Sequence, residues 1–378
     1  MIIKNLQSLS GFSGKRVILR LDLNVPIKDG KISNDFRIRQ SLRTTRFLKE
    51  GGAKTIIISH IRATETDSLE LVAAALKEYI PLAFAKDLEE MANMVEIMSD
   101  GSFVLLENIR RFPGEENNDP ALATKLASFG DFYINDAFSV SHRSHASVVG
   151  IPLLLPSYVG FLMEEEIRNI AEAFSPQHPA LFVLGGAKFS TKLILIEKFL
   201  KIYDFVFVCG ALANNFFKEK GLEVGRSKID ASATLPGVLK PLLENPRLLL
   251  PSEVVVKNNQ TISVKTPDKV SANDAILDAG SGAVANLATV LKEVKFVLWN
   301  GPLGEFENGF TSGTADFVKA LAASGVRSMI GGGDTVAAVS TLGLEGVFSF
   351  VSTGGGAMLD FLANETLPGI EALKNSKS

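Results

Sequence analysis

The sequence predicts an α/β protein of two domains, each a doubly wound parallel sheet. Its 378 residues are enough for about two domains of ordinary size. Short β-branched strands alternate with amphipathic helices, which is typical of a mostly parallel sheet with helices on both faces. Several of these strands end at charged or glycine-rich turns, and the ligands of open parallel sheets bind just beyond the strand ends.

Composition excludes several classes of function. A hydrophobic content of 46% with 21% charged residues is that of a globular protein, and a net charge of −3 argues against a nucleic-acid or polybasic membrane partner. Cys209 is the single cysteine, so no internal disulfide forms. The N-terminal segment lacks an apolar signal region, and the apolar stretch 148–163 is broken by Pro152 and Pro156. We expect a cytoplasmic protein that binds neither nucleic acid nor membrane.

Arginine and glycine are distributed unevenly along the chain. Ten of the fourteen arginines lie in residues 1–150, whereas 23 of the 32 glycines follow residue 150. Arginine forks bind anions, and glycine-rich loops allow the backbone to approach a ligand closely. The two halves are therefore expected to handle different parts of one reaction.

The first strand, expected within residues 16–25, alternates apolar and polar side chains. Arg20, Asp22 and Asn24 share one face, which makes either a solvated edge strand or a ligand wall.

A helix at 37–49 and strands at 54–60, 103–110 and 132–138 follow, with helices at 69–78 and 121–129 between them. Four basic residues come at or just after these strand ends: His60, Arg62, Arg110 and Arg143. Together they favour an anion site over scattered surface charge.

Residues 158–174 link the halves. Ile167, Ile170, Ala171 and Phe174 recur at helical spacing, which fits an ordinary surface helix or a connector between domains.

Two glycine-rich turns in the second half suit phosphate. Lys188 and Lys192 flank a predicted helix start, where cations oppose the helix dipole unless a polyphosphate lies between them. In the other turn, residues 331–333 are glycines, followed by Asp334 and Thr335. Backbone N–H groups there can bind phosphate while Asp334 binds Mg²⁺. The alternative is a plain turn with Asp334 or Thr335 as the N-cap.

Other nucleotide motifs are absent or incomplete. No G-x-x-x-x-G-K-[ST] string occurs. Residues 280–285 approach a dinucleotide fingerprint, but Asn300 stands where the ribose-binding acid belongs, which disfavours a dehydrogenase. Zinc spacing and a G-x-S-x-G elbow are absent too.

Taken together, a series of ordered strings closely resembles the phosphoglycerate kinase family along essentially the whole chain. They are Arg20-Leu-Asp-Leu-Asn-Val-Pro26, Ser59-His60, Leu106-Glu-Asn-Ile-Arg110, Asn135-Asp-Ala-Phe138 with His142-Arg143, Gly185-Gly-Ala-Lys188, Trp299-Asn-Gly-Pro302, Gly331-Gly-Gly-Asp-Thr335 and Ser352-Thr-Gly-Gly-Gly356.

The resemblance implies two domains facing across a cleft, which closes over the substrates. Residues 1–157 would bind 3-phosphoglycerate, 158–175 would form the interdomain helix, and 176–366 would bind Mg·ATP or Mg·ADP. Residues 367–378 would return to the first domain. The implied protein is a monomeric glycolytic kinase.

The resemblance also carries residue roles. The implied substrate contacts are Asp22, Leu23, Asn24, Arg37, His60, Ile61, Arg62, Arg110 and Arg143. Among these, Asp22 and Asn24 would hold the hydroxyl and carboxyl region, Arg37 would reach the carboxyl or acyl-phosphate end, and the cationic residues would hold the 3-phosphate.

In the second half, the implied nucleotide contacts are Lys192, Gly280, Glu307, Gly332, Gly333, Asp334 and Thr335. Asp334 would be the Mg²⁺ ligand and Glu307 the ribose contact. The amides of Gly332–Thr335 and Gly354–Gly356 would cradle the transferring group. The implied catalytic residues are Arg37, Lys188, Gly332 and Gly355.

The chain departs from the family pattern in a few places. Ser139 replaces a usual glycine, and Arg62 aligns only across a one-residue gap in a shortened loop. A catalytically silent relative that binds ligand without turnover is therefore the second hypothesis, and a dehydrogenase is the third.

Overall fold

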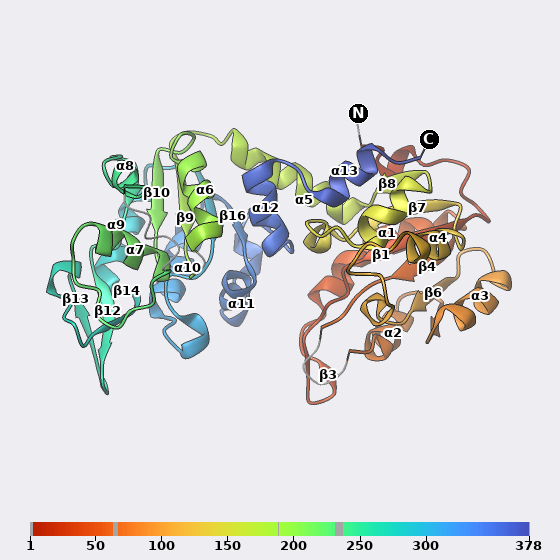
Figure 1. The fold of residues 1–378 in the computed structure, drawn as a ribbon, viewed down its shortest axis with the longest axis horizontal. Helices are drawn as coiled ribbons and strands as arrows, with labels where there is room; N and C mark the ends of the chain where they lie inside the picture. The colour runs from red at the N-terminus through yellow and green to blue at the C-terminus, as the bar shows by residue number, and fades with distance from the viewer. Residues whose placement is uncertain (1–2, 63–66, 188, 231–236, 378) are drawn as a thin grey trace. The chain divides into compact units, whose positions relative to one another are not determined.

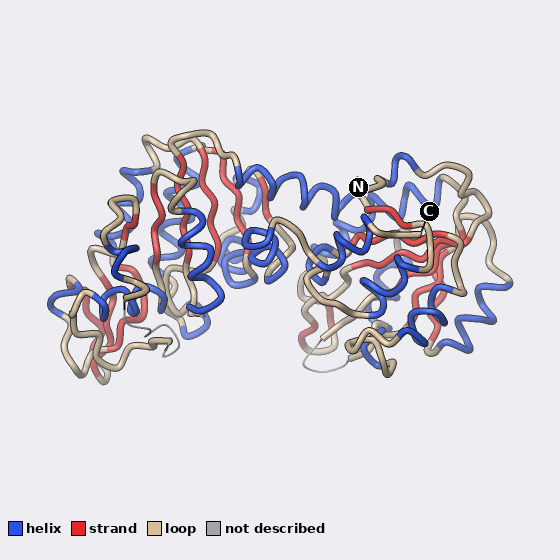
Figure 2. The backbone as a smooth tube through the Cα atoms, turned by 45° about the horizontal axis from the view of Figure 1, so that its top comes forward, coloured by secondary structure: helices blue, strands red, loops and turns tan. Residues whose placement is uncertain are grey.

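The computed structural model describes residues 3–62, 67–187, 189–230 and 237–377, and its contacts divide the chain into two compact units. The first unit contains Met1–Arg168 and Asn364–Ser378, and the second contains Asn169–Ala363. Helix α5 (Phe161–Ala171) includes the point at which the units divide. Each unit contains a six-stranded parallel sheet (Figures 1 and 2), so the predicted fold class is confirmed.

The sheet of the first unit has the strand order β5-β6-β4-β1-β7-β8. Its strands in chain order are β1 (Arg16–Leu21), β4 (Lys54–Ile58), β5 (Leu82–Ala85), β6 (Phe103–Leu106), β7 (Phe132–Asp136) and β8 (Ser157–Val159). All neighbouring pairs are parallel, and Arg20 of β1 lies opposite Ile58 of β4 and Asn135 of β7. Strand β1 is therefore central, which excludes the edge-strand interpretation.

Helices cover the sheet of the first unit. They are α1 (Phe36–Glu50), α2 (Glu70–Lys77), α3 (Leu88–Glu96), α4 (Pro120–Ala127) and α13 (Pro368–Lys374), and a short hairpin pairs β2 (Ile27–Lys28) with β3 (Lys31–Ile32). The C-terminal segment packs closely here, because Gly369 N donates to Ser141 O at 2.8 Å and a Cβ at Gly369 would lie 2.9 Å from the Ser141 side chain.

The main sheet of the second unit has the strand order β11-β10-β9-β15-β16-β17. Its strands are β9 (Ala180–Leu184), β10 (Phe205–Val208), β11 (Leu248–Leu249), β15 (Phe296–Asn300), β16 (Arg327–Gly331) and β17 (Phe350–Val351). The accompanying helices are α6 (Phe189–Phe199), α7 (Ala211–Glu219), α8 (Lys240–Leu243), α9 (Ser281–Val290), α10 (Ser312–Ser324), α11 (Gly333–Thr341) and α12 (Gly356–Asn364). Trp299 is fully buried at its centre, edge-on to Phe317 at 4.9 Å between ring centroids.

A second, antiparallel sheet in this unit was not predicted. It consists of β12 (Val254–Asn258), β13 (Thr261–Lys265) and β14 (Ala275–Ala279) in the order β13-β12-β14. The strand just before Gly280 is β14, so the near-match to a dinucleotide fingerprint at 280–285 follows a strand of this antiparallel sheet and not of the parallel one. A hairpin turn with Asn259 at φ 52° joins β12 to β13, and buried Asp274 pairs with Lys265 at 2.6 Å.

Within the described ranges, no helix combines the length and the apolar character needed to cross a bilayer.

Candidate functional site

The first unit gathers basic side chains at one edge of its sheet. Strands β1, β4, β6 and β7 are adjacent and parallel, so their carboxyl ends meet there. The predicted anion-site residues follow three of these strands. His60 and Arg62 come after β4, Arg110 after β6, and Arg143 after β7.

A hydrogen-bond network joins the residues beyond β1 to helix α1. The Asp22 carboxylate is only 4% exposed and accepts from the Arg37 guanidinium and from the Ser139 hydroxyl. The Asn24 amide N–H also donates to Asp22 at 3.2 Å, while the Asn24 side-chain oxygen accepts from Arg62 N at 2.8 Å. The serine that replaces a usual glycine thus has a defined partner, and Arg62 is connected to Asn24 despite its shortened loop.

His60 is buried beside several cations. Its ring lies 3.4 Å from the Arg20 guanidinium, and its pKa is well below the ordinary value, first because of burial and then because of Arg20, Arg110 and Arg37. His60 is therefore neutral at physiological pH and can donate one hydrogen bond and accept another.

Arg110 supplies a donor that the described chain leaves without a hydrogen bond. Its Nε is buried and has no hydrogen-bond partner among the described residues, although it forms an ion pair with Glu116 Oε1 at 3.6 Å, a distance too long for a hydrogen bond. Burial lowers the Arg110 pKa. The Glu116 carboxylate opposes this shift, whereas the charges of Arg143, Arg20 and Arg62 lower the pKa further. A buried donor without a partner is costly, so this site suits an anionic ligand.

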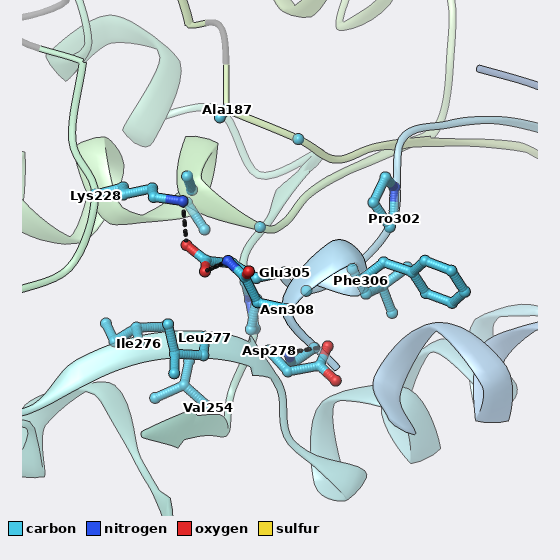
Figure 3. Close-up of a pocket in the computed structure, with 18 of the residues that line it drawn as sticks. Ala187, Lys228, Val254, Ile276, Leu277, Asp278, Pro302, Glu305, Phe306 and Asn308 are labelled. Atoms are coloured by element: carbon cyan, nitrogen blue, oxygen red, sulfur yellow. Dashed lines mark hydrogen bonds and ion pairs between the residues drawn. The ribbon is translucent and has the colours of Figure 1, made fainter. Parts of the chain in front are cut away.

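The second unit contains a cavity of about 170 Å³ beyond the strand ends of its main sheet (Figure 3). One part of its wall is glycine-rich loop, with Gly186 and Gly210, and Asp334 lies on the lining as well. Other parts are apolar, formed chiefly by Phe217, Pro251, Val254, Ile276 and Leu277. A cavity with both kinds of wall can hold a molecule that has a flat apolar end and a charged end.

The turn before α11 has the geometry of an anion-binding loop. Gly332 has φ 97°, a conformation that favours glycine, and α11 begins at the next residue. Thr335 Oγ1 is buried and accepts from Gly301 N at 2.8 Å, and no side chain caps the helix, so the N-cap interpretation of Asp334 and Thr335 is wrong. Asp334 is exposed in the first turn of α11.

Comparison with known proteins decides the family, because the sequence matches the phosphoglycerate kinase model over residues 6–365. The chain belongs to the phosphoglycerate kinase family. The phosphoglycerate kinase of Novosphingobium aromaticivorans is 38% identical over 397 residues, covering 99% of this chain and 100% of that one. The phosphoglycerate kinase of Thermus thermophilus is 42% identical over 383 residues, covering 96% and 97%.

Solved structures of phosphoglycerate kinases agree with this assignment. The structure from Coxiella burnetii superimposes with a TM-score of 0.85 at 34% identity and covers 100% of both chains. The structure from Pyrococcus horikoshii OT3 has a TM-score of 0.84 at 31% identity and covers 99% of both chains. The suspected phosphoglycerate kinase family is therefore confirmed across the whole fold.

Several residues that the phosphoglycerate kinase pattern predicts as ligand contacts are buried or closely packed. Leu23 and Ile61 are almost fully buried, and their amides already bond to Ser59 Oγ at 3.0 Å and Asn108 Oδ1 at 3.4 Å. Gly280 is packed against Glu253, next to the lining residue Ala279. Their ligand contacts stay predictions.

The remaining positions expected from the phosphoglycerate kinase pattern lie on the lining of the second-unit cavity or follow the strands of the second unit's main sheet. Glu307 is exposed on the cavity lining. The Lys192 ammonium is buried and donates to Gly185 O, inside the glycine-rich loop. Gly355 has φ 51°, and a Cβ there would meet no neighbour within 4 Å. Lys188 lies outside the described residues.

Sequence reasoning missed the buried groups that lie beside the basic residues of the first unit. The Arg20 guanidinium is 1% exposed and donates to Ser147 Oγ at 3.0 Å and Leu21 O at 2.7 Å. The buried Glu115 carboxylate accepts from Ser147 N at 2.9 Å and lies 3.7 Å from His145. Arg20 was expected on a solvated edge strand or a ligand wall, but it is buried and bonds to Ser147, a partner far away in the sequence.

Proposed function

We propose that this chain reversibly transfers a phosphoryl group between ATP and the carboxylate of 3-phosphoglycerate, forming ADP and 1,3-bisphosphoglycerate. This is a glycolytic phosphotransferase reaction with a carboxyl group as acceptor. The observation that carries the proposal is the group of cationic side chains around His60, which includes a buried Arg110 Nε with no hydrogen-bond partner in the described chain. Such a site needs an anion to satisfy it.

In the proposed complex, the first unit binds 3-phosphoglycerate. His60, Arg62, Arg110 and Arg143 bind its 3-phosphate, because guanidinium forks match phosphate oxygens in charge and shape. Arg37 leaves its partner Asp22 to meet the substrate carboxylate, and Asp22 and Asn24 then hold the hydroxyl and carboxyl region. Arg37 thereby screens the repulsion between the attacking carboxylate and the phosphoryl group.

The second unit binds the nucleotide in its cavity. The base occupies the apolar part, Glu307 contacts the ribose, and Lys192 contacts the phosphates. Asp334 carries an exposed carboxylate beside the glycine amides, a donor set that fits Mg²⁺ shared with phosphate oxygens. When bound, Mg²⁺ neutralises phosphate charge during the transfer.

Transfer requires the two substrates to meet away from water, because water would intercept the phosphoryl group. Residues 1–157 and 176–366 are the proposed substrate-binding domains, and they close through residues 158–175. Lys188 then bridges the transferring group, while the amides of Gly332 and Gly355 cradle it. The proposed enzyme is a cytoplasmic monomer, and residues 367–378 belong to its first domain.

A coupled assay of 1,3-bisphosphoglycerate formation tests this function. Purified chain should turn over 3-phosphoglycerate only with ATP and Mg²⁺, and Lys188→Ala should abolish turnover while leaving most of the ATP affinity measured by calorimetry. Ligand binding without any turnover in the unmodified chain would instead establish the silent relative, and binding of NAD would favour the dehydrogenase.

A further inference from the structure

Two residues on the wall of the proposed nucleotide cavity form an ion pair that has no role in the proposed reaction. Lys228 Nζ lies 2.9 Å from Glu305 Oε1, and both residues line the cavity (Figure 3). The Glu305 side chain is 21% exposed, whereas that of Lys228 is 64% exposed. The carboxylate is therefore the more enclosed partner, and the ammonium lies toward solvent.

The backbone around both residues is tied to strand β14. Glu305 N donates to Leu277 O at 2.8 Å, and Ile276 N donates to Ser227 Oγ, next to Lys228, at 2.8 Å. Ile276 and Leu277 belong to the apolar wall of the cavity. The ion pair is thus fixed at the apolar end, where a base would lie.

The segment carrying Lys228 has a second anchor on helix α7. Asn214 is 1% exposed, and its side-chain amide donates to Lys228 O at 3.0 Å. Helix α7 also contributes Ala213 and Phe217 to the cavity wall. The position of Lys228 is therefore built into the wall that faces Glu305.

The Glu305 carboxylate is held ready to accept a further hydrogen bond. Asn308 Nδ2 donates to Glu305 Oε2 at 2.9 Å while Lys228 holds Oε1. Burial alone would raise the pKa of Glu305, but the hydrogen bonds from Lys228 and Asn308 outweigh it and keep the pKa below its ordinary value. A carboxylate has about four acceptor sites, so room remains for a donor on the ligand.

The other buried carboxylate on the lining already has partners. Asp278 accepts from Ala279 N at 2.8 Å with one oxygen and from Gly313 N at 2.9 Å with the other. Both contacts hold local backbone, and Gly313 lies in the first turn of α10. Glu305 is therefore the better placed of the two to contact a base.

We propose that Glu305 selects the base of the nucleotide by accepting a hydrogen bond from the 6-amino group of a purine, and that Lys228 positions its carboxylate. This inference rests on the proposed nucleotide site and adds a specificity determinant to it. A carboxylate strongly favours a ligand that carries an N–H donor at this position. A ligand without the donor would displace water from the carboxylate and give no hydrogen bond in return.

The test compares ADP with the diphosphate of purine riboside, which differs only by lacking the 6-amino group. Isothermal titration calorimetry measures both dissociation constants, and the coupled assay measures kcat/KM for the two triphosphates. The unmodified chain should prefer the amino-bearing nucleotide about tenfold, the effect of one charge-assisted hydrogen bond near solvent. Glu305→Met should reduce this preference to less than threefold, with the KM for 3-phosphoglycerate unchanged.

Positioning by Lys228 has its own readout. Lys228→Met, which keeps the apolar stem, should reduce the preference by at least half, and Lys228→Arg should restore it. General damage to the cavity would weaken the binding of both nucleotides equally and leave the ratio of their dissociation constants unchanged. Lys319→Met is the matched control, because it breaks the exposed Lys319–Asp316 pair (3.3 Å) in the same unit, away from this cavity.

The outcomes separate this inference from the proposed function. An unmodified chain that binds both diphosphates equally, or a Glu305→Met variant that keeps the full preference, overturns the base-selection role even if phosphoglycerate turnover is normal. A chain that prefers ADP in calorimetry but transfers no phosphoryl group supports base selection and refutes the kinase activity.

Discussion

The contact between Arg37 and Asp22 can be measured by a double-mutant cycle on stability. Asp22 is 4% exposed and Arg37 29% exposed, so replacing Arg37 by Met leaves a nearly buried carboxylate without this cation. Breaking a fully buried pair costs about 3–5 kcal/mol. Here the Ser139 hydroxyl and Asn24 N–H still donate to Asp22, and water can replace part of the guanidinium. We therefore expect Arg37→Met to lower the free energy of unfolding by about 2 kcal/mol.

The second single variant of the cycle, Asp22→Asn, should lower the free energy of unfolding by less. In Asp22→Asn, the Arg37 guanidinium can turn toward solvent, so we expect a loss of about 1 kcal/mol. The double variant has neither a buried carboxylate nor its partner and should lose about 2 kcal/mol in total. The resulting coupling energy is about 1 kcal/mol, within the range of contacting residues.

Urea unfolding followed by two signals provides the assay. Far-UV circular dichroism reports both units, whereas fluorescence of Trp299, the single tryptophan, reports the second unit. The changes should appear in the circular dichroism transition of the first unit, with the Trp299 transition shifted much less. Equal effects of Arg37→Met with and without Asp22→Asn would refute a direct interaction between the two side chains.

Two further predictions concern the second unit. Gly332→Ala should lower the free energy of unfolding by about 1–2 kcal/mol in Trp299-monitored unfolding, because Gly332 has φ 97°. Gly333→Ala should change it by less than about 0.5 kcal/mol, because a Cβ at Gly333 enters open space, and similar losses in both variants would contradict this explanation. Burial raises the pKa of Asp278 to about 6, so the stability that its protonated form contributes is complete below about pH 4 and is lost as the pH rises through 6. Relative to the unmodified chain, Asp278→Asn should gain roughly 2–3 kcal/mol between pH 4 and pH 7.5, and a pH-independent difference would rule out the raised pKa.

The sequence predicted the features that depend on local pattern. The strands predicted at 54–60, 103–110 and 132–138 are β4, β6 and β7, and each ends earlier than predicted. The helix expected at 37–49 is α1. In a parallel sheet, the strand ends determine which side chains meet, so the pattern predicted that these basic residues follow neighbouring strands, and their ligand contacts stay predictions.

Features that depend on distant partners could not be predicted. The sequence of strand β14 does not distinguish it from the parallel strands. Its antiparallel pairing depends on β12, about twenty residues earlier. Arg20 alternates with apolar residues like a ligand-facing group, but its guanidinium bonds to Ser147, 127 residues away. The cavity likewise combines segments from 186 to 334. Such contacts are determined by tertiary packing, and the local periodicity of the sequence does not show which distant segments will pack together.

The stability of the first-unit site is limited by its charges, and this limit follows from its function. Arg110 lies near Arg143, Arg20 and Arg62, each of which lowers its pKa, and the pKa of buried His60 falls well below its ordinary value for the same reasons. Additional acids would relieve this repulsion, but they would also compete with an anionic substrate for the same guanidinium groups. The network instead neutralises Arg37 with Asp22, a contact that the proposed substrate would replace, and Ser147 supports the buried Arg20. A substrate phosphate would then supply the missing negative charge, so anion binding should stabilise the first unit more than the second.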